Sequence, residues 1–376
     1  MIVIYATKLF ILLVNKCINS YIFITNKECK NWRLRDGPSL LSQRYVATLE
    51  LRFIVGYEQL IVQLVNIIQV GTVVLLSPLI SGIINRLKAM IESKHGPSIL
   101  QPYYDLSKLL KKEVVVPQRS SLIFLAAPFV IFTAYLVISL VVPIVTLYPL
   151  PYGILLDLLG GALMFGFAGM ISIIAALDAR TNYTIMGASR SASFTALAEP
   201  TLIMIFFAVA IISGTNNPYI TNNILAESGS WYLSATHVLV VAAFFMLLLV
   251  ETGRLPVESS GVMELGMLDD AKVMEYSGKL LALSKWGGYM KNFLLMSIFL
   301  NVFVIPWGMS NHADVIGALY SVGTLFVKLL VLIVVIVITE ETFAKLRLFK
   351  ILDFLSISFS LGLLSIISLF LVGRGA

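Results

Sequence analysis

The stretch VIGALYSVGTLFVKLLVLIVVIVIT, residues 315–339, contains a single charged side chain, Lys328. A helix needs about 20 mostly apolar residues to cross a bilayer, and this stretch is long enough. Similar apolar runs along the chain show no period of two, so they are not typical of barrel strands. Together they predict eight transmembrane helices, the other seven at about residues 59–84, 121–147, 152–176, 194–214, 232–250, 290–308 and 351–373.

The composition indicates the same fold class. Of the 376 residues, 58% are hydrophobic and 13% are charged, which excludes a water-soluble core. Because backbone groups inside a bilayer must be paired within the protein, runs of this kind fold as α-helices. We therefore predict an all-α polytopic membrane protein, with eight transmembrane helices and cytoplasmic amphipathic loops.

Lys and Arg residues lie in every second connection between the predicted spans. The alternate connections, residues 148–151, 215–231 and 309–314, contain none. Since these cations accumulate on the cytoplasmic side, we expect a multi-pass protein of the cell (plasma) membrane. Its basic loops would lie in the cytoplasm, and both ends of the eight-helix core would lie outside.

Residues 1–56 break this pattern, because they carry basic residues such as Lys27 and Arg52 on the side predicted to be outside. Two interpretations stay open. Translation starts near Val55, so that residues 1–54 are absent from the mature protein, or these residues form a lineage-specific peripheral arm. We divide the chain into an N-terminal extension, residues 1–56, and a transmembrane domain, residues 57–376.

The chain contains few residues that could ligate a metal. Cys17 and Cys29 both lie in the extension, whereas an iron–sulfur cluster needs about four thiolates. His95, His237 and His312 are scattered over different loops and spans, which does not predict a zinc site. We expect no cofactor, redox centre or complete active site on this chain, and we expect electron carriers on partner subunits.

Carboxylates gather at one predicted end of the spans. Glu199 is expected about five residues inside its span, beside Pro200, while Glu251 and Glu340 are expected at the inner ends of theirs. Ionisable groups near hydrocarbon are costly and usually functional. We predict a site for proton or ion coupling, with a solvated surface as the alternative for the loop acids. The candidates are Glu199, Glu251, Glu258, Glu264, Asp269, Asp270, Glu275, Lys328 and Glu340.

Lys328 is the deepest cation, and it lies too far from the inner edge to reach water along its own side chain. We expect its amine to be neutral, paired with a carboxylate or exposed to an internal aqueous cavity. The first basic connection contains the break Gly96-Pro97 and then residues 101–112, which predict an amphipathic helix. That helix would anchor the chain to anionic lipid, dock a soluble partner, or do both.

Several motifs together resemble one family. They are Gly96-Pro97, Gln101-Pro102 with Asp105 and Lys108, Gly187-Ala-Ser-Arg190, Leu197-Ala-Glu199-Pro200, Glu251-Thr-Gly-Arg254-Leu-Pro256 and Glu275-Tyr-Ser-Gly278. This pattern, over about residues 57–373, is similar to the family of the H-type membrane component of NADH:quinone oxidoreductase (complex I). It is closer to the hydrogenase branch of that family, the formate hydrogenlyase subunit 4 type of membrane-bound group 4 nickel–iron hydrogenases.

The resemblance implies a membrane-arm coupling subunit that anchors a soluble electron-transfer module and links its redox chemistry to proton or sodium translocation. The implied partners are large and small soluble subunits, antiporter-like membrane subunits and the bilayer, with nickel–iron and iron–sulfur centres on those partners. It also implies a relay role for Lys328. The implied residues for docking or loop structure are Gly96, Pro97, Gln101, Asp105, Lys108, Arg190, Arg254 and Pro256.

Two alternatives stay open. The quinone-using branch has a Pro-Phe-Asp-Leu-Pro-Glu type of run after its arginine, whereas residues 255–261 read LPVESSG. This departure favours the hydrogenase type over a quinone-chamber subunit. A stand-alone secondary ion transporter is the more distant alternative, and such transporters usually contain internal repeats. No duplication is visible between the first four predicted spans and the last four.

Overall fold

The computed structural model describes residues 38–118, 120–148, 157–227, 234–254, 271–310, 314–342 and 350–372, with side chains from residue 61 onward. The chain divides into two units, Met1–Glu58 and Gln59–Ala376, and the second unit contains the helical bundle. Most of the predicted N-terminal extension, with Cys17 and Cys29, lies outside the described residues. The division at residue 56 therefore stays a prediction.

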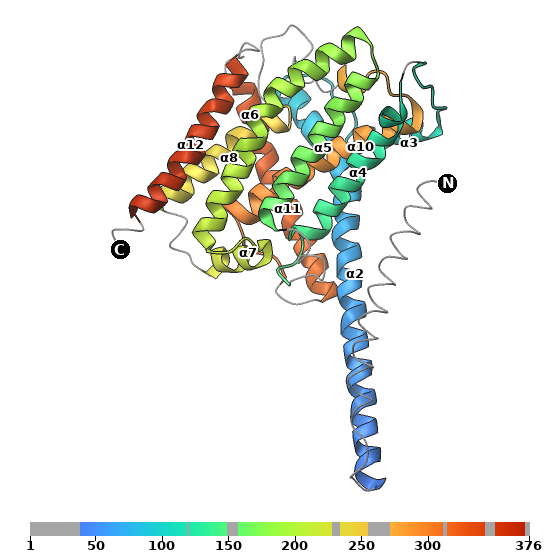
Figure 1. Ribbon diagram of the computed structural model, residues 1–376, viewed down its shortest axis with the longest axis vertical. Coiled ribbons are helices and arrows are strands. Elements are labelled where there is room, and N and C mark those ends of the chain that lie inside the picture. The colour runs from blue at the N-terminus through green and yellow to red at the C-terminus, as the bar shows by residue number, and fades with distance from the viewer. Residues whose placement is uncertain are drawn as a thin grey trace. The chain divides into compact units, whose positions relative to one another are not determined.

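The described part of the chain is helical and contains no β-strand (Figure 1). Its elements are α2 (Pro38–Ile91), α3 (Gln101–Lys111), α4 (Leu122–Val141), α5 (Leu158–Asp178), α6 (Asn182–Ser213), α7 (Pro218–Glu227), α8 (Ala235–Glu251), α10 (Gly278–Ile298), the π-helix η4 (Phe299–Val304), α11 (Val315–Thr342) and α12 (Lys350–Val372).

Seven segments are long and apolar enough to cross a membrane, which confirms an all-α polytopic membrane protein. The predicted span at 232–250 corresponds to α8, which is apolar but has only 17 residues. This length lies at the lower limit for a membrane-crossing helix. The exact number of eight spans therefore stays a prediction.

Three helices begin or end further from their apolar runs than we predicted. Helix α2 continues to Ile91, α6 starts at Asn182 rather than near residue 194, and α10 starts at Gly278 rather than near residue 290. An apolar run marks the part of a helix that hydrocarbon favours, but backbone hydrogen bonds carry the helix on through polar residues. The corrected bounds place Arg86, Lys88, Arg190, Lys279, Lys285 and Lys291 on helices rather than in loops.

Neighbouring helices pack in a connected order. Helix α5 lies between α4 and α6, and α12 runs beside α8 and α6 (Figure 1). Aromatic rings join three of these segments at the centre. The ring of Phe244 in α8 meets that of Phe303 in η4 edge to face at 4.7 Å between centroids, and meets Phe206 of α6 at 5.8 Å. Edge-to-face pairs of this kind add to the energy of area burial.

The connection after α3 is fastened to the start of α10. The amide of Val115 donates to the Ser277 hydroxyl at 2.6 Å, and that hydroxyl donates to the Val115 carbonyl at 2.9 Å. Tyr276 stacks on Phe124 with 4.1 Å between ring centroids, and burial raises the pKa of its hydroxyl. The amphipathic helix α3 is confirmed, although Tyr104 and Leu110 of its expected apolar stripe are exposed in this chain.

Gly278 should be indispensable at this junction. Its φ of +52° is strained for a residue with a side chain, and an added Cβ would collide with the backbone carbonyl of Glu113. We expect Gly278→Ala to lower the free energy of unfolding by about 2 kcal/mol, measured by thermal unfolding of the purified protein in detergent. Gly288→Ala is the control, because no atom lies within 4 Å of its added Cβ. Equal stability of the two variants would contradict this account.

Candidate functional site

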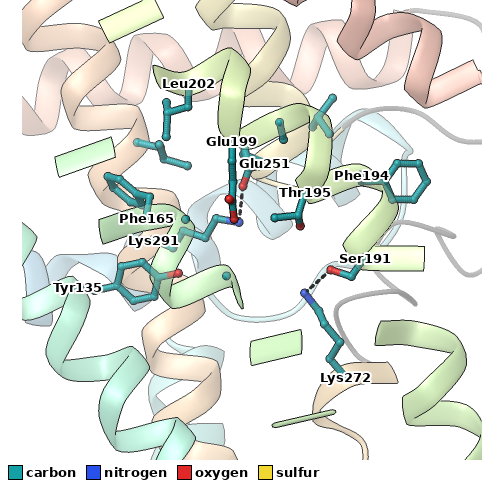
Figure 2. A pocket seen from close by; sticks show the side chains of 15 residues that line it. Tyr135, Phe165, Ser191, Phe194, Thr195, Glu199, Leu202, Glu251, Lys272 and Lys291 are labelled. Carbon is teal, nitrogen blue, oxygen red and sulfur yellow. Dashed lines mark hydrogen bonds and ion pairs between the residues drawn. The ribbon is translucent and has the colours of Figure 1, made fainter. Parts of the chain in front are cut away.

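An internal cavity of about 90 Å³ opens where α5, α6, α8 and α10 meet (Figure 2). This volume has room for several water molecules. Both polar and apolar side chains line it, which suits a partly hydrated site inside a membrane bundle. The lining residues are Tyr135, Phe165, Gly166, Gly169, Ser191, Phe194, Thr195, Ala198, Glu199, Leu202, Val250, Glu251, Lys272, Lys291 and Leu295.

Glu199 reaches the cavity from the interior of α6. Its Oε1 atom is buried and has no hydrogen-bond partner among the described residues. Pro200 follows directly and has no amide hydrogen, so the helix lacks one backbone hydrogen bond at this point. A carboxylate beside such an irregularity is tolerated where the bundle faces water or another polar group.

Glu251 and Lys291 form an ion pair beside Glu199. The Lys291 Nζ atom of α10 lies 2.5 Å from Oε2 of Glu251, the last residue of α8. The two side chains are 27% and 21% exposed, so the pair is largely shielded from solvent. Figure 2 shows the Glu199 carboxylate next to this pair, with Lys272 further away and donating to the Ser191 hydroxyl at 3.0 Å.

A second charged cluster begins three residues after Glu251. Glu340 of α11, whose side chain is fully buried, pairs with Lys88 of α2 and lies 3.9 Å from Nη1 of Arg254. Arg254 also donates to the side-chain oxygen of Asn85 at 3.2 Å. Burial lowers the pKa of Arg254 and the Glu340 carboxylate opposes this effect, so the guanidinium stays charged. The end of α8 thus joins both charged clusters.

Lys328 lies apart from both clusters. Its ammonium donates to the Ile305 carbonyl at 2.8 Å and to the Asn301 side chain at 3.4 Å. Asn301 in turn donates to the Ile144 carbonyl at 2.9 Å. Neutral oxygens at the end of η4 therefore surround the amine, and none of its described hydrogen bonds or ion pairs is to a carboxylate. We expected a carboxylate, a neutral amine or an aqueous cavity, and these backbone and amide acceptors are a different arrangement.

The structure brings together only part of the predicted site. Glu199 and Glu251 share one cavity, and Glu340 joins Arg254. Glu275 does not line the cavity, and Lys328 lies elsewhere. Residues Pro256, Glu258, Glu264, Asp269 and Asp270 lie outside the described residues.

The predicted docking residues lie on exposed parts of the bundle. Arg86 donates to the Gly96 carbonyl at 2.7 Å and thereby closes the loop before α3. Gln101 and Asp105 bond to each other at 2.9 Å across one turn of that helix. These contacts explain local loop structure. Lys108 and Arg190 are exposed, and the loop contains Pro97 before α3.

No group of metal-ligating side chains occurs among the described residues. His237 is buried, and its Nε2 lies 2.8 Å from the Phe303 carbonyl. This contact gives the histidine a structural partner. His95 is described as well, whereas His312 lies outside the described residues.

The sequence analysis missed the cations that complete both clusters. Lys88 and Lys291 entered only the charge count for orientation, although each lies next to an apolar run on a helix. A lysine at the edge of a span is the available signal, but its partner cannot be read from spacing, since Lys88 and Glu340 are 252 residues apart.

An apolar groove lies on the outside of the bundle between α2, α3 and α10. Leu75, Tyr103, Leu106, Leu110 and Trp286 contribute to its wall, together with Ser107 and Lys111. The Tyr103 hydroxyl donates to the Leu75 carbonyl, and the Trp286 indole donates to the Val74 carbonyl at 3.0 Å. The groove therefore has an apolar surface in which the polar tips of the aromatic residues are already bonded.

These features define a polytopic helical membrane protein with a carboxylate-lined internal cavity. Residues 62–372 match the NADH dehydrogenase family, and the chain belongs to that family. Formate hydrogenlyase subunit 4 of Escherichia coli (strain K12) is 33% identical over 285 residues, covering 75% of this chain and 90% of that protein. Hydrogenase-4 component C of the same organism is 31% identical over 301 residues, covering 79% and 92%.

Solved structures show the same fold. A subunit of the membrane-bound sulfane sulfur reductase, an archaeal respiratory membrane complex, aligns with a TM-score of 0.67 at 20% sequence identity. The alignment covers 81% of this chain and 98% of that chain. At this identity the likeness supports the arrangement of helices and carries no conclusion about chemistry.

The buried Glu340 gives a stability test. We expect Lys88→Met to lower the free energy of unfolding by roughly 3 kcal/mol, because it removes one partner of a buried carboxylate. The additional change Glu340→Gln should restore part of that loss, since no buried charge is then left without Lys88. Thermal unfolding in detergent measures both. A double variant that is no more stable than Lys88→Met would contradict the buried ion pair.

Proposed function

We propose that this chain is a membrane-arm coupling subunit of a respiratory complex I-like or membrane-bound hydrogenase complex. In this role it anchors a soluble electron-transfer module and links that module's redox chemistry to translocation of protons or sodium ions. Family membership and the hydrogenase-type relatives support the assignment. The observation that carries the mechanism is the Glu199 carboxylate, which lies beside the Glu251–Lys291 ion pair in a cavity large enough for water.

Charge balance explains how such a site can exchange a proton. Two carboxylates, Glu199 and Glu251, lie beside one ammonium, Lys291, that is bonded to Glu251. Charges in an apolar surrounding must be paired, bind a proton or contact water. A shift of Lys291 from one carboxylate to the other would therefore exchange which of them takes the proton. The two carboxylates titrate as a coupled pair in this scheme.

The route from partner subunits to this site would pass the end of α8. Arg254 is bonded there to Asn85 and lies near Glu340, so a movement of the following segment changes the surroundings of Glu340 and Glu251 together. The segment contains the acids Glu258, Glu264, Asp269 and Asp270, which we propose as the entrance of the acidic path, with Glu275 beside it. Lys328 would act further along as a relay to an antiporter-like subunit.

The basic ends of the helices are proposed to face the cytoplasm of a cell whose plasma membrane holds the complex. On that side α3 and the loop at Gly96 would contact the large and small soluble subunits. Those partners would hold the nickel–iron and iron–sulfur centres. Copurification of this chain with such subunits would support this assembly, whereas a stable solitary homodimer would favour a stand-alone ion transporter.

A quinone-chamber subunit is the second candidate, and the groove between α2, α3 and α10 favours it. An apolar wall that includes Tyr103 and Trp286 suits an amphiphilic ring compound or a lipid tail. The sequence after Arg254 favours the hydrogenase type instead. A photoreactive quinone that labels the groove in the native complex, with competition by unlabelled quinone, would establish the second candidate. Labelling without competition would count against it.

Glu199→Gln tests the proposed role of the carboxylate. The amide keeps the shape of the side chain but cannot bind or release a proton near neutral pH. We expect the complex to assemble, while translocation in sealed vesicles per electron-transfer turnover falls on the order of 10²-fold. Asp157→Asn is the matched control, because Asp157 is an exposed residue directly before α5 and does not line the cavity.

Unchanged ion translocation in Glu199→Gln, in an assembled complex, would reduce Glu199 to a structural residue. An equal loss in Asp157→Asn would also contradict the proposal, since the effect would then be unrelated to the cavity.

A further inference from the structure

The Glu199 carboxylate lies against a bare stretch of the neighbouring helix α5. A Cβ atom built on Gly166 would be 3.0 Å from Cδ of Glu199, 3.1 Å from its Oε2 and 3.3 Å from its Oε1. One on Gly169 would be 3.5 Å from Oε1. Gly166 and Gly169 are one helical turn apart, so both belong to the face of α5 that packs on α6. The space that two methyl groups would need is occupied by the carboxylate.

Glycine is a poor choice for the interior of a helix on local grounds. It costs more backbone entropy than alanine does, and the apolar helix α5 contains alanine at many neighbouring positions. Close packing of the α5 and α6 backbones alone would not explain the contact, because the atoms that meet Gly166 belong to the end of a charged side chain. A local choice that opposes helix formation at one contact indicates a constraint imposed by the site.

We propose that Gly166 and Gly169 form a slot that positions the Glu199 carboxylate against α5 and apart from the Lys291 ammonium. This inference rests on the proposed function of Glu199 and adds two positioning residues to it. Neither glycine touches an ion or a substrate. Each acts by leaving room for the side chain that does.

The slot explains why Glu251 and not Glu199 binds Lys291. Glu199 lies close enough to both residues to interact with them electrostatically, yet the described ion pair is to Glu251 at 2.5 Å. The cavity offers room on the side away from α5. A side chain at position 166 would push the carboxylate into that room, toward Lys291. Glu199 would then compete for the ammonium and lose the freedom to take up a proton in place of a salt bridge.

Helix α5 supplies a graded set of variants to test this slot. Gly161→Ala is the matched control, because no atom lies within 4 Å of its added Cβ. Gly169→Ala places the methyl group at ordinary contact distance from Glu199. Gly166→Ala makes that contact tight, and Gly166→Val fills the place of the carboxylate. Ion translocation per electron-transfer turnover is measured for each variant in sealed vesicles that contain the intact complex.

We expect translocation to be unchanged in Gly161→Ala, reduced least in Gly169→Ala, more in Gly166→Ala and about tenfold or more in Gly166→Val, since small displacements of reacting groups lower rates strongly. The conservative change Glu199→Asp supplies the rescue. Its side chain is shorter by one methylene, so in the Gly166→Val background the carboxylate clears the valine. The double variant should translocate more than Gly166→Val alone, which a merely structural defect at position 166 would not produce.

The outcomes separate the slot from the proposed function. If Glu199→Gln abolishes translocation but Gly166→Ala and Gly166→Val behave like Gly161→Ala, the slot is refuted and the role of Glu199 stands. If Glu199→Gln has no effect, the proposed function fails by itself. Should Gly166→Val not assemble, the comparison of Gly166→Ala with Gly161→Ala decides. A double variant that is no better than Gly166→Val also overturns the inference.

Discussion

Compensation of buried charge is the constraint on which the structure depends. The bundle is built from apolar helices, and each carboxylate that enters it needs a cation, a proton or water. Glu340 is compensated by Lys88 with Arg254 nearby, and Glu251 by Lys291. Glu199 differs, because none of its described contacts is an ion pair and its Oε1 is buried. One carboxylate without a permanent cation, beside others that have one, is what a site for reversible proton binding requires.

Long helices make this arrangement possible. Because α2, α6 and α10 extend beyond their apolar runs, charged residues on them are held by backbone geometry and not by loops. The end of α8 connects the two charged clusters within three residues, from Glu251 to Arg254. Arg254 also begins the segment that links α8 to α10. A change transmitted from a soluble partner along this segment would act on both clusters at once.

Much of the fold could be predicted from sequence, because hydropathy and helix formation are local properties. The apolar runs gave the order and approximate places of the spans, and the positions of Glu199, Glu251 and Glu340 near predicted span ends indicated the site. Their partners could not be predicted. Lys291, Lys88 and Gly166 acquire their meaning from helices that pack together across large sequence separations, and a glycine in an apolar run gives no sign that a carboxylate lies against it.

Infrared difference spectroscopy of the native complex tests the central claim most directly. Spectra recorded between resting and turning-over complex report carboxyl groups that gain or lose a proton. If Glu199 exchanges a proton during coupling, a carboxyl C=O stretching signal present in the unmodified complex will be absent in Glu199→Gln and will shift when glutamate is isotopically labelled. Identical carboxyl signals in the two complexes, at equal turnover, would contradict the claim.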